Sequence, residues 1–128
     1  MDAHPPQCVL VIEDDESLSD LLSVALRMRG YQVRTAGDGL AGLRLLEAYE
    51  PDVVVLDLGL PIANGFDVVT ELRAVTKTRM TPVIAISGLE EPLRAARQSA
   101  DFVATLAKPF EPDALVALVE RALRVYRV

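Results

Sequence analysis

The chain has 128 residues, a length that fits one compact domain with a single core and leaves no room for a second. Its 19 acidic residues outnumber its 13 lysines and arginines, and the formal net charge is -6 at pH 7. Direct contact with nucleic acid needs clustered Lys and Arg, so we expect none; a cationic ligand or a basic partner suits this charge better.

The start of the chain has no features of a targeting segment. Residues 1–7 are polar, contain proline and lack the apolar centre of a signal peptide, and no stretch of the chain reaches the length of a membrane span. We therefore predict a cytoplasmic protein without membrane contact, with a short flexible leader at 1–6 and one domain at 7–127. The only cysteine, Cys8, cannot form an internal disulfide and is predicted to be a small buried hydrophobic residue.

Short apolar runs alternate along the chain with segments of helical periodicity. Two apolar stripes have the spacing of an amphipathic helix, namely Leu18, Leu21, Leu22, Ala25 and Leu26, and Leu115, Leu118, Val119, Ala122 and Leu123. Further helices are predicted at 39–49, 65–76 and 89–98. Strands are predicted at 7–13, 31–35, 52–57, 82–87 and 102–106. Glycines and prolines fall at the joins between these elements.

This alternation predicts five βα units in an α/β fold. The runs 53–56 and 83–86 are apolar without alternation, which is typical of parallel strands covered by helices on both faces. Parallel strands need right-handed crossovers, and five such units wind most naturally into an open sheet. We predict a flavodoxin-like, doubly wound, five-stranded parallel sheet of order 2-1-3-4-5, with five helices on its two faces.

Acidic residues stand where two of these apolar runs end. Glu13, Asp14 and Asp15 close the run 8–12, and Asp57 closes the run 53–56. In the predicted order the first strand lies beside the third, so these carboxylates converge at the carboxyl edge of the sheet, where ligands of such folds bind. Neighbouring carboxylates repel unless a cation, protonation or solvent relieves them. Mg²⁺ (or Mn²⁺) is the natural ligand, and zinc is disfavoured because no His or Cys accompanies the acids.

Some of these residues also have a structural interpretation. Asp15 and Glu16 open a helix, where acidic side chains cap free N–H groups, and for them we favour that role. For Asp14 and Asp57 we favour function, because Asp57 ends a buried strand and no helix start follows it. Ser87 could cap the next helix or bind an anion above the sheet.

Lys108 stands at an unusual place for a structural cation. The helix that follows it begins with acidic residues, so Lys108 lies near the positive end of that helix dipole. A lysine directed at an anion above Asp57 explains this position better than an exposed side chain without a role, although the second reading stays open.

The ordered set of motifs closely resembles the receiver domain of bacterial two-component response regulators. The resemblance covers nearly the whole chain and rests on these elements: Val11-Ile12-Glu13-Asp14-Asp15-Glu16, Pro51-Asp52-Val53-Val54-Val55-Leu56-Asp57-Leu58, Leu60-Pro61, Asn64-Gly65, Thr81-Pro82-Val83-Ile84 and Lys108-Pro109-Phe110. It implies transfer of a phosphoryl group to Asp57 from a phosphohistidine on a histidine kinase or a histidine phosphotransfer protein. The lone His4 lies in the leader, so the phosphodonor must be another molecule.

The resemblance also implies a role for each matching residue. Asp14 would be a direct Mg²⁺ ligand, Glu13 would act mainly through water, and Asp57 and the backbone carbonyl of Gly59 would complete the protein ligands. Ser87 and Lys108 would contact the phosphoryl oxygens. The protein would then be a phosphoacceptor regulator that assists its own phosphorylation and dephosphorylation, and not an enzyme acting on an external substrate.

The chain departs from the family pattern at one of the residues by which phosphorylation is relayed to the output surface, a mechanism called the switch. Thr105 stands three residues before Lys108, where the family usually has Tyr or Phe, so the switch is predicted to involve Ser87 and Thr105, with Phe102 in the core. Neither Gly59 nor Leu89 offers a side chain that could orient water, which predicts a long-lived phosphoryl group.

The candidate output surface is the face formed by the fourth helix, fifth strand and fifth helix, with Arg94, Arg97, Arg121 and Arg124; a merely solvated face is the alternative. We expect the output partner to be a protein whose identity the sequence does not give. We expect the oligomeric state to be a monomer or a phosphorylation-dependent dimer. A stand-alone regulator is slightly favoured over a receiver excised from a longer protein.

Three other functions compete with the regulator. An aspartate-dependent phosphatase typically carries a second Asp two residues after its nucleophile, where this chain has Gly59. A flavodoxin-like FMN carrier needs a phosphate loop after the first strand, where Glu13 and Asp14 would repel phosphate. A degenerate receiver that only binds partners is disfavoured by the intact set of Glu13, Asp14, Asp57, Ser87 and Lys108.

Overall fold

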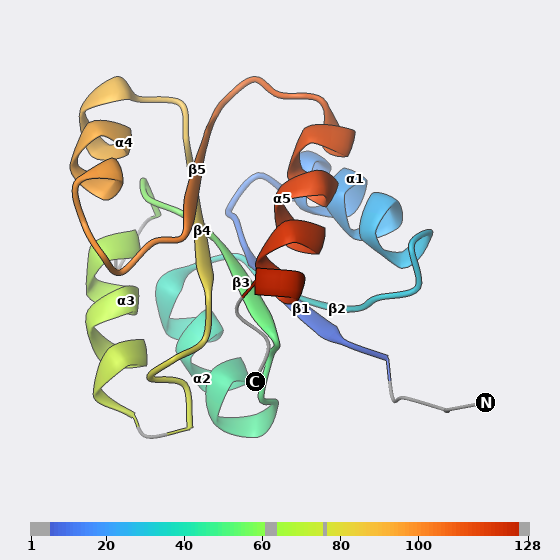
Figure 1. The fold of residues 1–128 in the computed structure, drawn as a ribbon, viewed down its shortest axis with the longest axis horizontal. Coiled ribbons are helices and arrows are strands. Elements are labelled where there is room, and N and C mark those ends of the chain that lie inside the picture. Colours follow the sequence, from blue (N-terminus) through green and yellow to red (C-terminus); the bar gives the residue numbers. More distant parts are fainter. Residues whose placement is uncertain (1–5, 61–63, 76, 126–128) are drawn as a thin grey trace.

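A computed structural model describes residues 6–60, 64–75 and 77–125, and in them five strands alternate with five helices (Figure 1). The strands are β1 (Cys8–Ile12), β2 (Gln32–Ala36), β3 (Val53–Asp57), β4 (Val83–Ser87) and β5 (Ala104–Ala107). The helices are α1 (Glu16–Arg27), α2 (Gly39–Ala48), α3 (Gly65–Ala74), α4 (Glu90–Arg97) and α5 (Pro112–Val125).

The strands form one parallel sheet in the order β2-β1-β3-β4-β5, which confirms the predicted topology. Its pairing register sets Ile12 beside Leu56, and Asp57 beside Ile86. The carboxyl ends of β1, β3 and β4 therefore lie next to one another at one edge, and the residues that directly follow these strands are neighbours in space.

Helices cover both faces of the sheet, as predicted (Figure 1). Helices α1 and α5 pack on one face, where Leu22 and Leu115 meet one set of alternate strand residues. Helices α2, α3 and α4 pack on the other face, where Leu46, Leu72 and Leu93 meet the other set. The inner strands β3 and β4 are covered on both sides and are buried along their whole lengths.

Two predicted core residues are more exposed than expected. Leu21 is 51% exposed, because successive helix residues lie about 100° apart and α1 turns Leu22 and Leu26 toward the sheet instead. Cys8 is half-buried rather than buried, since it opens β1 at the edge of the core, and burial raises the pKa of its thiol. Phe102 is buried as predicted and packs edge-to-face on Phe66, with ring centroids 5.7 Å apart.

The element boundaries differ from the predicted ones by one to two residues. The strand expected from residue 102 begins at Ala104, because residue 102 turns into the core before the ladder starts. The helix expected to end at residue 76 ends at Ala74, where the chain becomes extended at Val75. Residues 1–5, 61–63, 76 and 126–128 lie outside the described residues, and with them most of the predicted leader, His4, Pro61 and the predicted domain end at 127. Across the described residues, no helix has the length and apolar character that a bilayer crossing requires.

Candidate functional site

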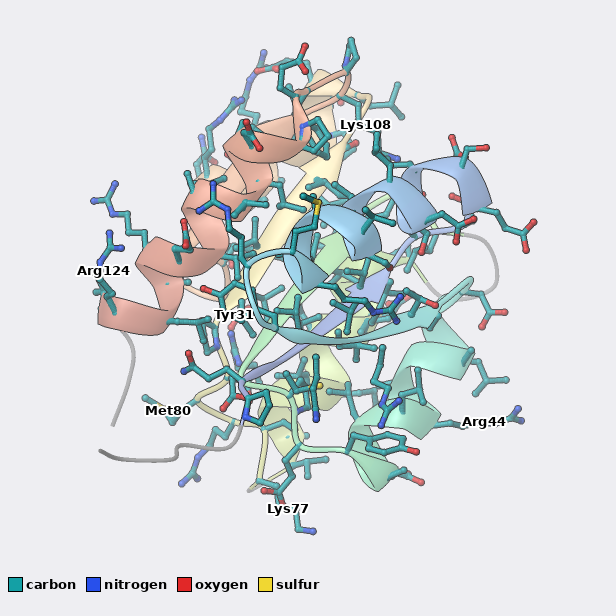
Figure 2. The ribbon with its side chains drawn as sticks, turned by 90° about the vertical axis from the view of Figure 1, so that its right-hand side faces the viewer. Tyr31, Arg44, Lys77, Met80, Lys108 and Arg124 are labelled. Atoms are coloured by element: carbon teal, nitrogen blue, oxygen red, sulfur yellow. The ribbon has the colours of Figure 1, made fainter. Side chains whose placement is uncertain are left out.

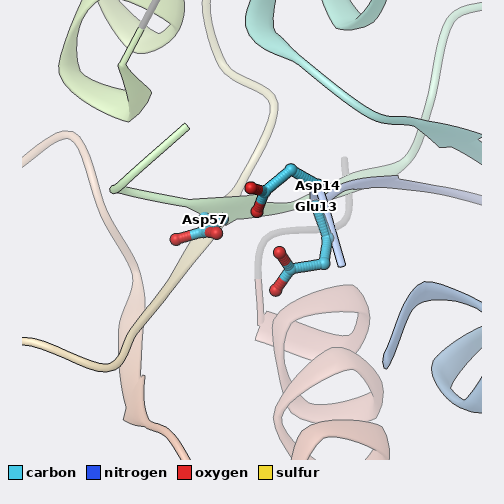
Figure 3. A group of neighbouring side chains, drawn as sticks. All are labelled: Glu13, Asp14 and Asp57. Atoms are coloured by element: carbon cyan, nitrogen blue, oxygen red, sulfur yellow. The ribbon is translucent and has the colours of Figure 1, made fainter. Parts of the chain in front are cut away.

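Three acidic side chains meet at the carboxyl edge of the sheet (Figure 3). Asp57 is the last residue of β3, and Glu13 and Asp14 directly follow β1, the neighbouring strand. One carboxylate oxygen from each residue lies within 4.8 Å of the others. The convergence predicted from the strand order is therefore present in the fold.

The three carboxylates differ in exposure. The Glu13 and Asp57 residues are only 2% and 5% exposed, whereas Asp14 is exposed. Oε2 of Glu13 accepts a hydrogen bond from the backbone N–H of Asp15 at 3.1 Å, and Oδ1 of Asp57 accepts one from the N–H of Gly59 at 2.9 Å. Backbone donors thus fix one oxygen of each buried carboxylate.

The Lys108 ammonium contacts two of these three acids. Its Nζ lies 3.2 Å from Oδ2 of Asp57 and 2.5 Å from Oε1 of Glu13. Its backbone N–H donates to the carbonyl of Ser87 at 2.8 Å, which ties the residue to the end of β4. Figure 2 shows Lys108 at one end of the molecule and Lys77 at the opposite end.

Burial dominates the electrostatics of Glu13. It raises the pKa of this carboxyl to about 7, although the Lys108 ammonium and the N–H of Asp15 act in the opposite direction. Burial alone would lower the pKa of the Lys108 ammonium, but Glu13 and Asp57 outweigh it and the pKa is raised. Lys108 therefore stays charged, and the acid cluster carries more negative charge than one ammonium neutralises.

The residues present fit a hard divalent cation. Oε1 of Glu13 is buried and contacts the Lys108 ammonium, and the other donors of the cluster are likewise carboxylate oxygens. Oxygen-only donor sets suit Mg²⁺, which binds through one or two carboxylates and keeps several waters. The exposure of Asp14 leaves room for those waters on the solvent side of the cluster.

Ser87 lies at the same edge of the sheet. It ends β4, is buried, and its Oγ accepts the backbone N–H of Leu89 at 3.0 Å. This bond holds the turn after β4 but does not cap α4, because that helix begins after Leu89 and has no side-chain cap. The hydroxyl proton is not used by that bond and remains a donor.

The other predicted residues lie near the site or on the face beside it. Thr105 is half-buried on β5 and pairs in register with Ala85, two residues before Ser87 on the adjacent strand. Asp15 caps α1 by accepting the N–H of Leu18 at 3.2 Å, the structural role favoured from the sequence. The exposed side chains of Arg94, Arg97, Arg121 and Arg124 lie on α4 and α5, and Arg97 pairs with Glu90 at 2.9 Å.

The direct pairing of Glu13 with Lys108 is a feature that the sequence did not reveal. The spacing of the acids predicted a role for Glu13 toward a metal, and the helix dipole directed Lys108 toward Asp57 alone. The two residues are far apart in the sequence, and the strands that they follow, β1 and β5, are not neighbours in the sheet. No local pattern predicts such a contact.

The chain belongs to the response regulator receiver domain family, whose model matches residues 9–120. It is 37% identical over 119 residues to the DNA-binding dual master transcriptional regulator RpaA of Synechocystis sp., covering 91% of this chain and 48% of RpaA. It is 36% identical over 118 residues to the DNA-binding response regulator MtrA of Mycolicibacterium paratuberculosis, covering 92% and 52%. The chain thus spans about half the length of these relatives.

A solved structure shares the whole fold. The chemotaxis response regulator CheY4 of Vibrio cholerae superposes with a TM-score of 0.85 at 28% identity, covering 93% of this chain and 100% of that one. The fold, the acid cluster and the family match agree that this chain is a receiver domain of two-component response regulators.

The relatives correct one expectation drawn from the net charge. We expected a protein without direct contact to nucleic acid, but RpaA and MtrA are both DNA-binding regulators. The acidic charge is a property of this chain, which spans about half the length of each of those relatives. The net charge of one domain therefore does not exclude DNA binding by a regulator that contains further domains.

Proposed function

We propose that Asp57 accepts a phosphoryl group from a phosphohistidine of a histidine kinase, and that the resulting acyl phosphate changes how the receiver binds an output partner. The observation that carries the proposal is the setting of Asp57, a buried strand-end carboxylate with Lys108 Nζ at 3.2 Å and two further acids within reach of a shared cation. Family membership supports the same chemistry.

The transfer is a direct displacement. A carboxylate oxygen of Asp57 attacks the phosphorus atom in line, the bond from phosphorus to the imidazole nitrogen breaks, and its electron pair returns to the ring. The product is a mixed anhydride of Asp57 with phosphate. An ionised carboxylate needs no general base, and phosphoryl transfer depends mainly on positioning and charge neutralisation.

The residues around Asp57 divide these tasks. Glu13, Asp14, Asp57 and the carbonyl of Gly59 would hold Mg²⁺, which supplies charge neutralisation and orientation to the phosphoryl oxygens. The Lys108 ammonium, which contacts both Asp57 and Glu13, would pair with a phosphoryl oxygen. The buried hydroxyl of Ser87 would donate its free proton to another.

The output would pass through the face formed by α4, β5 and α5. A phosphoryl group carries up to about two negative charges and draws donors toward it. The Oγ of Ser87 now accepts from Leu89, so a move of Ser87 toward the phosphate would release the start of α4. Thr105 on the adjacent strand would accommodate the change. The names of RpaA and MtrA support DNA binding as the process controlled.

Two finer predictions belong to this proposal. The domain would assist its own phosphorylation and dephosphorylation without acting on other substrates, and its phosphoryl group would be long-lived, because Gly59 carries no side chain beside Asp57 and Leu89 carries an apolar one. The cytoplasmic location and the boundaries at residues 6 and 127 also stay predictions from the sequence.

Intact-mass measurement tests the proposal directly. The wild type would be incubated with a small acyl phosphate and Mg²⁺ beside Asp57→Asn and the exposed-acid control Asp67→Asn. We expect one added phosphoryl group in the wild type and in Asp67→Asn, and none in Asp57→Asn or without Mg²⁺. An adduct that persists in Asp57→Asn, or no adduct in the wild type, would reject Asp57 as the acceptor.

A further inference from the structure

Gly65 opens α3 in direct contact with the main chain that carries the phosphoacceptor. A Cβ atom at this position would lie 2.8 Å from Cα of Leu58 and 2.9 Å from the carbonyl oxygen of Asp57, and 2.9 Å from Cδ2 of Leu58. Non-bonded carbon atoms are at their optimal separation at about 3.5 to 4.0 Å, so any side chain here would clash. Two of the three contacts are with backbone, which cannot rotate away as a side chain can.

The backbone that Gly65 touches is also held from the other side. Asp57 pairs with Ile86 in the sheet register, and the N–H of Leu58 donates to the carbonyl of Ile86 at 3.0 Å. The N–H of Gly65 in turn donates to the carbonyl of Leu58 at 3.3 Å. The end of β3 is therefore clamped between β4 and the first residue of α3.

We infer that Gly65 is a positioning residue for the phosphoacceptor: it lets the start of α3 pack directly against the Asp57–Leu58 backbone and so fixes where the carboxylate stands. The inference rests on the proposed function of Asp57. A Cβ at residue 65 must displace either α3 or the end of β3. The chain between the two contains Gly59, whose N–H holds Oδ1 of Asp57 at 2.9 Å, so either displacement alters the carboxylate.

Gly42 provides a matched control in the same molecule. It is also a buried helix glycine, and a Cβ there would lie 2.5 Å from Cδ1 of Ile12. Its three nearest contacts all belong to the Ile12 side chain, and none is backbone. Gly42→Ala therefore forces a side-chain rearrangement in the core, while Gly65→Ala forces a backbone displacement beside Asp57.

The test compares wild type, Gly65→Ala and Gly42→Ala in three measurements. The first is Mg²⁺ affinity by calorimetry, the second is the rate of phosphorylation by acetyl phosphate from intact mass, and the third is the amide NMR shift of Gly59. We expect Gly65→Ala to lose about tenfold or more in Mg²⁺ affinity and phosphorylation rate, in the range that lost support of a metal or reacting group causes. Its Gly59 amide should shift, while Gly42→Ala keeps wild-type values in all three.

Folding is checked by circular dichroism, and trimethylamine N-oxide is added to all samples if Gly65→Ala is partly unfolded, since this osmolyte favours the folded state. Wild-type Mg²⁺ affinity, rate and Gly59 shift in folded Gly65→Ala would overturn the inference, and so would equal losses in Gly42→Ala. A wild type that takes no phosphoryl group would reject the proposed function instead. The Gly59 shift still decides the positioning role in that case.

Discussion

Replacing Glu13 by glutamine should change how the stability of the metal-free protein depends on pH. Burial raises the pKa of Glu13 from 4.5 to about 7 in the folded chain. Between these two values the folded chain keeps a proton that the unfolded chain has lost, so the contribution of Glu13 to stability falls as the pH rises through this window. Glutamine resembles the protonated acid and has no such loss.

The size of the effect follows from the two pKa values. Each pKa unit corresponds to about 1.4 kcal/mol, so the full change across the window is about 3 kcal/mol. Urea unfolding of wild type and Glu13→Gln in EDTA at several pH values from 4.5 to 8 measures it, since the titrating groups outside the acid cluster contribute equally to both proteins. We expect similar stabilities near pH 4.5 and a variant that is more stable by about 3 kcal/mol at pH 8. Parallel stability curves over this range would refute a buried, proton-holding Glu13.

Two further predictions concern side chains that stabilise the fold. Arg73 donates hydrogen bonds from α3 to the backbone carbonyls of Thr78, Thr81 and Asp101, so Arg73→Ala should cost about 2 kcal/mol in urea unfolding, whereas the exposed control Arg44→Ala should stay within about 0.5 kcal/mol. Asp15→Ala removes the cap of α1 and should cost about 1 kcal/mol in the same assay; an unchanged midpoint would show that the cap does not stabilise the helix.

The fold was predictable because each rule that governs it acts on local sequence. Uninterrupted apolar runs identified β3 and β4 as strands covered on both faces, and the spacing of apolar residues identified α1 and α5. Right-handed connections then favoured an open, doubly wound sheet, for which we predicted the order 2-1-3-4-5. The prediction that Leu21 lies in the core was wrong, because the apolar stripe of a helix is wider than the part of the helix that contacts a sheet. The sequence does not show which residues of the stripe lie at its centre.

The candidate site was predictable to the level of which residues meet, but not of how they pair. Strand ends placed Glu13 and Asp57 together, because their strands are neighbours. The contact of Lys108 with Glu13, by contrast, joins the ends of two strands that are distant in the sequence and are not neighbours in the sheet. The crowding at Gly65 depends on which atoms surround the position that a Cβ would occupy. Both are properties of packed backbone that residue identities do not carry.

The arrangement of the site is a consequence of strand order more than of any single residue. Adjacent strands lie about 4.8 Å apart, and β3 stands between β1 and β4. Asp57 therefore has the acids that follow β1 on one side and Ser87, at the end of β4, on the other, while Lys108 follows β5 and contacts both Asp57 and Glu13. A phosphoryl group on Asp57 would stand between the acids that hold the cation and the Ser87 hydroxyl, with the Lys108 ammonium within reach. Had β2 lain between β1 and β3, the acids would be roughly 10 Å away, too far to share a cation with Asp57.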